Sequence, residues 1–250
     1  MKLGIEATWK FMLDSIYFYG KDHIKDDSPI REEIGLRFRI TSPLIEKTPT
    51  ALSISSQQFL KMISDGVFDI DNYPIKGEAL ADYVSSIYHK DKIAIHDFDP
   101  NKQSANSFVY TYPERLEALW INDKECNIEP ISQLDVICRR LEQNLGSNRA
   151  IAVLYQAGFD STEVDIPCLQ LIQALVRDDK LILVVFFRSN DIYGAFPSNM
   201  MFISNIGLMI QERLNKTYPN VRFDHIEYHV SSAHIYKTDL NAVERIIKQE

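Results

Sequence analysis

Hydrophobic positions along the chain change between helical and strand-like spacing. Apolar side chains recur at intervals of three and four over residues 131–145, so this segment is predicted to be an amphipathic helix. Helices are also expected over residues 5–19, 55–64, 77–88, 199–215 and 238–249, and a polar loop over residues 91–108.

Strands are expected mainly in the second half of the chain. Alternating or continuous apolar runs predict strands over residues 34–41, 149–155 and 222–231. Residues 167–176 and 181–187 flank the polar stretch Arg177-Asp178-Asp179-Lys180 and predict a hairpin. Both arms are apolar on both faces, so we expect this hairpin to be central and covered on each side. The pattern predicts a mixed α/β chain, and residues 1–250 are expected to form a single domain.

Composition narrows the classes of function. The apolar fraction of 45% and the charged fraction of 25% are those of a soluble globular protein. The net charge of −8 argues against a broad nucleic-acid surface, although a few local arginines suffice for one phosphate. The apolar run from Leu181 to Phe187 is too short to cross a membrane, and the first residues lack a signal peptide's apolar core. A cytoplasmic protein is expected.

A cysteine and an arginine-rich segment are the best candidates for chemistry. Cys126, Cys138 and Cys168 have no Cys-x-x-Cys spacing, so neither structural zinc nor another metal is expected. A free cysteine is usually a buried packing residue, as expected for Cys138. Cys168 differs because it follows Pro167 at a strand start, where a side chain can face a cavity. The next strand ends in Arg188-Ser189-Asn190-Asp191, and a guanidinium beside a thiol favours the nucleophilic thiolate.

The polar residues that follow Cys168 in the chain each allow two interpretations. Arg188, Ser189 and Asp191 could hold a phosphate and position a base. Asn199 could cap the helix that begins nearby, or offer an amide donor and acceptor to a planar heterocycle. His234 and Tyr236 alternate, so both point to the same side of a strand, either to bind a sugar hydroxyl or to form an ordinary solvated face.

The order of these groups resembles that in thymidylate synthases. The residues around the motifs are most similar to those of the archaeal-type branch. The shared motifs are Pro167-Cys168, Gln173, Arg188-Ser189-Asn190-Asp191, Pro197-Ser198-Asn199 and His234-Ile235-Tyr236. The resemblance covers roughly residues 145–240 and implies the α/β fold of that family, a mixed sheet packed with helices.

The resemblance also implies a reaction on dUMP. Cys168 would add to C6 of the uracil, and the resulting enolate would attack a one-carbon unit on a reduced pterin carrier. Further roles are implied for residues that match the family motifs: Arg188, Ser189 and Gln173 would bind the nucleotide, Asn199 would read O4 and N3 of the base, His234 and Tyr236 would bind the 3′-hydroxyl, and Asp191 would face the base and the pterin.

Assignments in the first half are less direct. Glu78 is the candidate for the family glutamate that organises water and proton transfer, with Glu114 as runner-up, and Tyr112 would match a family tyrosine. Arg31 would match the phosphate-loop arginine. Arg149 stands where the family supplies phosphate-binding arginines across a dimer interface, which implies a homodimer.

Departures from the family pattern concern the carrier. Leu169 stands where histidine is usual, Phe187 where glutamine is usual, and His96 near an expected tryptophan. The chain also ends before the segment that closes over folate in the usual family. We therefore expect a one-carbon donor other than ordinary methylenetetrahydrofolate, such as methylenetetrahydromethanopterin, and keep methylenetetrahydrofolate as the alternative. Two alternatives stay open, namely a pyrimidine-nucleotide 5-hydroxymethylase and a nucleotide-binding homologue that has lost catalysis.

Overall fold

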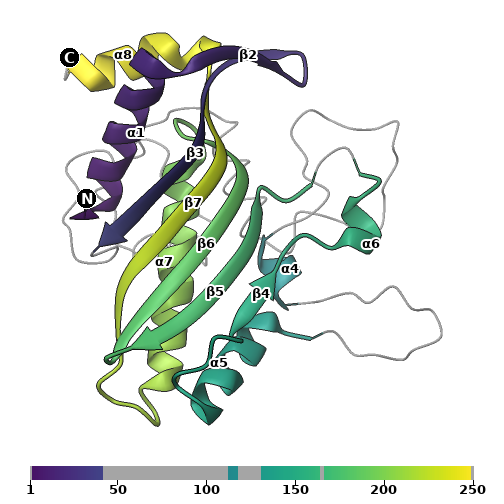
Figure 1. Ribbon diagram of the computed structural model, residues 1–250, viewed down its shortest axis with the longest axis vertical. Coiled ribbons are helices and arrows are strands. Elements are labelled where there is room, and N and C mark those ends of the chain that lie inside the picture. The colour runs from purple at the N-terminus through teal and green to yellow at the C-terminus, as the bar shows by residue number, and fades with distance from the viewer. Residues whose placement is uncertain (1, 42–111, 118–130, 164–165, 249–250) are drawn as a thin grey trace, which may run out of the picture.

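The described residues are organised around a seven-stranded mixed sheet (Figure 1). The computed structural model describes residues 2–41, 112–117, 131–163 and 166–248. The strands lie in the order β1-β3-β7-β6-β5-β4, with β2 paired to β3. Their bounds are Lys2–Leu3 (β1), Lys21–Lys25 (β2), Ser28–Thr41 (β3), Ile151–Val153 (β4), Leu169–Arg177 (β5), Lys180–Asp191 (β6) and Arg222–Tyr236 (β7). The predicted α/β class is confirmed.

The helices agree with most of the predicted segments. They are α1 (Ile5–Tyr19), α4 (Tyr112–Glu117), α5 (Gln133–Gln143), α6 (Ala157–Asp160), α7 (Phe196–Leu214) and α8 (Leu240–Lys248), the last preceded by the 3₁₀ turn η4 (Lys237–Asp239). The prediction for residues 5–19 is confirmed at both ends, whereas α7 begins three residues before the predicted position 199. The predicted helices 55–64 and 77–88 and the loop 91–108 lie outside the described residues.

Two hairpins use the same turn chemistry. The predicted β5–β6 hairpin is confirmed, and its turn residues Asp178 and Asp179 have φ of 50° and 58°. Two consecutive residues with positive φ fit the right-handed twist of a tight hairpin, and aspartate tolerates this conformation. Asp26 and Asp27 repeat it between β2 and β3, with φ of 47° and 62°. The alternation over residues 34–41 therefore indicated only the second half of a longer strand.

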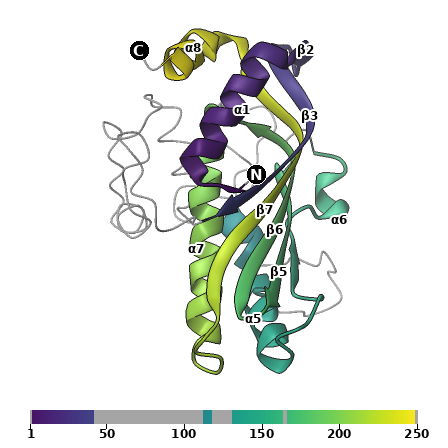
Figure 2. The same ribbon diagram turned by 60° about the vertical axis from the view of Figure 1, so that its left-hand side comes forward.

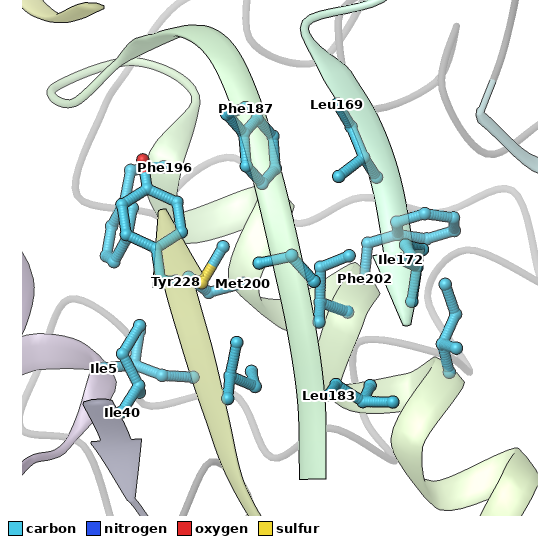
Figure 3. Close-up of a cluster of buried hydrophobic side chains, with 14 of the residues drawn as sticks. Ile5, Ile40, Leu169, Ile172, Leu183, Phe187, Phe196, Met200, Phe202 and Tyr228 are labelled. Atoms are coloured by element: carbon cyan, nitrogen blue, oxygen red, sulfur yellow. The ribbon is translucent and has the colours of Figure 1, made fainter. Parts of the chain in front are cut away.

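Helices α1 and α7 pack on the same face of the sheet, as Figure 2 shows. On this face Leu181, Leu183, Val185 and Phe187 of β6 are fully buried. They contribute to a continuous core that also contains Leu169, Ile172, Phe196, Met200 and Tyr228 (Figure 3). No described helix is long and apolar enough to cross a membrane.

The opposite face of the same strands is less covered. Phe186 is 41% exposed, and Ile151 and Val153 on β4 are 38% and 42% exposed. The prediction that the hairpin is covered on both sides was therefore wrong. An apolar strand face indicates a surface that avoids water, but the sequence does not say whether this chain or another molecule covers it.

Candidate active site

Cys168 lies immediately before β5, where the backbone of β6 holds it. The Arg188 N–H donates to the Cys168 carbonyl at 2.9 Å. The Arg188 guanidinium donates to the carbonyls of Pro167 (Nε, 3.1 Å) and Ile166 (Nη2, 2.5 Å). Cys168 is half-buried and packs against the core. The predicted neighbours are thus brought together, and Arg188 positions the segment that carries the thiol.

Tyr112 approaches this segment from α4. Its hydroxyl oxygen accepts a buried hydrogen bond from the Leu169 N–H at 3.3 Å. Its ring packs against Phe202 of α7, with the ring centroids 5.9 Å apart. The structure therefore places the phenol of Tyr112 beside the residue that follows Cys168.

Ser189 and His234 form the centre of a second polar group. The Ser189 Oγ lies 3.3 Å from His234 Nδ1, and His234 Nε2 lies 3.2 Å from Lys25 Nζ. Lys25 also donates to the Tyr236 hydroxyl at 3.2 Å. Because an ammonium group can only donate, Nε2 of His234 is the acceptor and Nδ1 carries the proton that faces Ser189.

The electrostatics of this group favour an anion. Desolvation is the main cause that lowers the pKa of His234 to about 4, and the positive charges of Lys25 and Arg188 lower it further. His234 is therefore neutral near pH 7, while Lys25 and Arg188 are cationic. Lys25 contacts the neutral histidine, and the charge of Arg188 acts on it electrostatically. This arrangement would suit a phosphate and a sugar hydroxyl.

Lys25 is a candidate site residue that the sequence interpretation missed. Arg31, the predicted phosphate-loop residue, instead donates from Nε to Asp22 at 3.0 Å and from Nη1 to the Tyr17 carbonyl at 2.8 Å. Lys25 ends β2, and its Nζ contacts both His234 and Tyr236. The available signal was the Asp26-Asp27 pair, which repeats the Asp-Asp turn predicted between β5 and β6 and would have indicated a hairpin here.

Asp191 shapes the turn from β6 into α7. Its Oδ1 accepts from the N–H groups of Tyr193 and Gly194, both at 3.0 Å. A Cβ atom on Gly194 would lie 2.4 Å from Asp191 Oδ2, so a larger residue at this position would displace the Asp191 carboxyl group. Desolvation raises the pKa of the Asp191 carboxyl to about 6. The carboxyl group is thus held in place and titrates close to neutral pH.

Asn199 lies within the first turns of α7, and the N-cap interpretation was wrong. Ala195 occupies the N-cap, because the chain turns into the helix directly after the Asp191 turn. The Asn199 side chain is buried, and its Nδ2 donates to Asn190 Oδ1 at 3.1 Å. Asn190, which was not predicted to have a role of its own, donates in turn to the Tyr228 hydroxyl at 2.9 Å.

Two predicted nucleotide ligands lie elsewhere in the described chain. Gln173 pairs with Ile151 across β4 and β5, and its Nε2 donates to the Asn148 carbonyl at 2.8 Å. Arg149 is exposed next to this edge. Glu78 and His96 lie outside the described residues, as does the side chain of Glu114.

The arrangement includes a candidate nucleophile, two cationic side chains and a hydrogen-bonding amide, a combination that would suit a covalent reaction on an anionic heterocyclic substrate. Within the described ranges, no group of three or more His, Cys, Asp or Glu side chains could hold a metal ion.

The family model and similar known proteins point to the same family. The thymidylate synthase family model matches residues 89–250. A relative from Methanothermobacter thermautotrophicus is 27% identical over 98% of this chain and 96% of its own length. One from Methanocaldococcus jannaschii is 27% identical over 82% of this chain and 89% of its own length. A third, from Methanosarcina barkeri, is 32% identical over 58% of this chain and 61% of its own length. All three carry the name "Putative thymidylate synthase". The chain belongs to the thymidylate synthase family.

Proposed function

We propose that the protein converts dUMP to dTMP, with Cys168 as the nucleophile and a reduced pterin as the one-carbon donor. The observation that carries this proposal is the set of contacts made by four consecutive residues. Arg188 binds the Cys168 segment, Ser189 contacts His234, Asn190 binds Asn199, and Asp191 turns the chain into α7. These contacts at one end of β6 support a single site made of the thiol, the proposed anion-binding group and the amide.

Cys168 begins the reaction. Its thiolate forms a bond to C6 of the uracil ring, and the C5–C6 electron pair moves to give an enolate. Carbon C5 then forms a bond to the one-carbon unit and loses its proton. Loss of this proton would break the bond between the one-carbon unit and the carrier nitrogen and leave an exocyclic methylene on C5. Hydride delivered to that carbon would expel the Cys168 thiolate and restore the C5–C6 double bond. The Tyr112 hydroxyl beside Leu169 is proposed to take part in this proton transfer, together with Glu78.

Lys25, Ser189 and Arg188 are proposed to bind the 5′-phosphate, a role in which Lys25 takes the place first considered for Arg31. His234 and Tyr236 contact Lys25 and are proposed to bind the 3′-hydroxyl. A neutral His234 can accept or donate a hydrogen bond without repelling the cations, which is consistent with its lowered pKa. Asn199 would pair with O4 and N3–H of the uracil.

Asp191 is proposed to hold the carrier. A carboxylate fits the amino and amide N–H donors of a pterin ring, and the two backbone N–H groups on Asp191 Oδ1 fix its orientation. When bound, the reduced pterin supplies a carbon at the oxidation level of formaldehyde and the hydride that reduces it to methyl. The family generally uses a folate-type carrier. Whether this protein takes tetrahydrofolate or a methanopterin-type compound is the part of the proposal to be tested first.

A homodimer is proposed to form through the exposed sheet face. Ile151, Val153 and Phe186 are all more than a third exposed there, and members of this family are usually dimeric. Pairing two copies over this face would bury these side chains. Arg149 and Gln173 lie at the edge of the face and could then complete the phosphate site of the partner subunit.

The test combines dUMP with each methylene carrier in single-turnover reactions, with mass spectrometry of the nucleotide product. The proposal predicts dTMP with at least one carrier and no product from Cys168→Ala. A 5-hydroxymethyl product would instead favour the hydroxymethylase. Unchanged dUMP with both carriers, from folded protein, would contradict the proposal.

A further inference from the structure

A buried ion pair holds the short helix that contains Tyr112. Arg115 lies one turn after Tyr112 in α4, and its Nη2 donates to Asp160 Oδ1 at 2.6 Å. The Asp160 side chain is 1% exposed and that of Arg115 is 13% exposed. The other carboxylate oxygen of Asp160, Oδ2, accepts from the Gln156 N–H at 2.6 Å. The Asp160 carboxylate therefore connects α4 to the start of α6.

Gln133 connects the same helix to β4. Its Nε2 donates to the Arg115 carbonyl at 2.8 Å and to the Val153 carbonyl at 2.9 Å, and its Oε1 accepts from the Val153 N–H at 2.9 Å. Figure 1 shows α4 beside β4, the last strand of the sheet on this side. Strand β4 pairs with β5, which begins immediately after Cys168. Two side chains thus connect α4 to the strands that hold the Cys168 segment.

The ion pair adds direction to the apolar packing of α4. Tyr112 and Leu116 are buried, the Tyr112 ring packs against Phe202, and Figure 3 shows Phe202 in one cluster with Leu169. Such dispersion contacts constrain the rotation of a helix less than a charge-assisted hydrogen bond does. Burying two charges costs free energy, so an apolar pair at these positions would attach α4 at least as strongly. What the pair at Arg115 adds is orientation.

We infer that Arg115 and Asp160 are positioning residues that orient the Tyr112 hydroxyl for proton transfer from uracil C5. Tyr112 and Arg115 are three positions apart, so their side chains lie on one side of α4 and move with the same rotation of the helix. The Tyr112 hydroxyl accepts from the Leu169 N–H at 3.3 Å, next to Cys168. A rotation that broke the Arg115–Asp160 contact would therefore displace the hydroxyl relative to the nucleophile, and small displacements of this kind slow catalysis strongly.

The inference rests on the proposed function, and two measurements separate it from that function. Release of tritium from 5-³H-dUMP, with methylenetetrahydrofolate or methylenetetrahydromethanopterin as carrier, reports loss of the C5 proton. Formation of the covalent adduct with 5-fluoro-dUMP and the same carrier reports attack by Cys168 without that step, because fluorine replaces the hydrogen on C5. A general structural defect would slow both reactions together.

Two variants remove the ion pair. Asp160→Asn keeps the shape of the side chain and an acceptor for the Gln156 N–H, and it removes the negative charge. The double variant Arg115→Met, Asp160→Asn removes both charges, so no buried charge is left without its counterion if Asp160→Asn alone fails to fold. Each variant is made in the native chain and in the Tyr112→Phe background, and urea denaturation confirms that it is folded.

The expected result is a loss confined to the proton-transfer step. Asp160→Asn and the double variant should slow tritium release by about tenfold to a hundredfold and leave adduct formation near the wild-type rate. In the Tyr112→Phe background they should add little further loss, because the hydroxyl that they orient is already absent. Glu142→Gln is the matched control and should keep both wild-type rates, since it removes another Arg–carboxylate contact between helices, that with Arg213 at 2.9 Å.

Four results would overturn the inference and leave the conversion of dUMP to dTMP intact. They are wild-type tritium release from the folded ion-pair variants, equal slowing of tritium release and adduct formation, the same additional loss in the Tyr112→Phe background as in the native chain, and wild-type tritium release from Tyr112→Phe itself. A wild type that releases no tritium with either carrier would overturn the proposed function.

Discussion

Strand β6 contains two buried regions that are stabilised by different interactions, one by apolar packing and the other by hydrogen bonds. Its first part carries Leu181, Leu183, Val185 and Phe187 into the core, where each is fully buried. Its last residues include Ser189 and Asn190, which are 5% and 2% exposed. The apolar end packs against apolar side chains and does not depend on one particular partner atom. The polar end instead makes hydrogen bonds to named partners, namely His234 for Ser189 and Tyr228 for Asn190.

This difference shows where the sequence allows change. A buried apolar side chain can be replaced by another of similar volume at modest cost, because dispersion contacts have little direction. A buried polar side chain loses its partner when it is replaced and leaves that partner unsatisfied. The apolar end of β6 should therefore determine stability, and the polar end should determine chemistry and specificity.

The largest expected effect is the loss of the nucleophile at the polar end. Cys168→Ala should abolish the covalent adduct with 5-fluoro-dUMP and lower turnover by at least about a thousandfold, because no thiolate remains to attack C6. Mass spectrometry of the intact protein measures the adduct. Cys138→Ala is the control, since this cysteine is buried on α5 and burial raises the pKa of its thiol to about 11. An adduct that persists in Cys168→Ala would identify another nucleophile.

The apolar end should give the largest effect on stability. Leu183→Ala should lower the free energy of unfolding by about 2–5 kcal/mol, because it leaves a cavity under α7. Urea denaturation measures this change. The ratio of dUMP to dCMP affinities should stay at the wild-type value in the folded fraction. A changed ratio would show that the two ends of β6 are not independent.

Lys25 should contribute more to nucleotide binding than Arg31. Lys25→Ala should raise the dissociation constant of dUMP roughly tenfold to a hundredfold, as expected for a lost bond to a charged group. Arg31→Ala removes a pair with Asp22 on a half-exposed surface and should change it less than about twofold. Calorimetry at two salt concentrations would check both, and the reverse order of effects would return the phosphate role to Arg31.

The smallest effect concerns pH, where Asp191 and His234 act in opposite directions. The pKa of Asp191 rises from 3.8 to about 6 on folding, so its contribution to stability is present below about pH 4 and is lost as the pH rises through 6. The pKa of His234 falls from 6.5 to about 4, so its contribution is present above pH 6.5 and is lost as the pH falls through 4. Between these limits the two slopes oppose each other.

Replacing either of these two side chains should reveal the pH dependence that the other contributes to the free energy of unfolding. In Asp191→Asn the free energy of unfolding should increase from pH 4.5 to 6 more steeply than in the wild type, by at most about 1.4 kcal/mol per pH unit. In His234→Gln it should increase less, or decrease, over the same range. Urea denaturation at these two pH values is sufficient. Identical slopes in both variants and the wild type would mean that neither pKa shifts on folding.

Much of the fold was predictable because local patterns determine local structure. The three- and four-residue spacing identified α1 and α5, and the Asp178-Asp179 turn identified the β5–β6 hairpin. The β2–β3 hairpin was missed, because its first arm, β2, is short and polar and lacks the apolar signal on which the prediction relied. The extent of β7 was also underestimated, since one strand joins the predicted segment 222–231 to His234 and Tyr236.

The candidate site was only partly predictable. Five candidate site residues could be selected because their types and their order resemble those of one family, namely Cys168, Arg188, Ser189, Asn199 and His234. Lys25 and Asn190 could not, because a surface lysine and a strand asparagine are common and neither residue type suggests chemistry alone. Their roles depend on contacts with residues that are distant in the sequence, such as His234 and Tyr228.

The sequence by itself determined the elements, the apolar character of β5 and β6, and the types and order of the reactive side chains. Only the tertiary structure decided which polar groups meet, because hydrogen bonds across α7, β6 and β7 depend on register and on distances between atoms that no local pattern records. It placed Lys25 beside His234 and turned Asn199 toward Asn190. Helices cover one face of the β5–β6 hairpin and leave Phe186 on the other face exposed, an asymmetry that the apolar pattern of the strands did not distinguish.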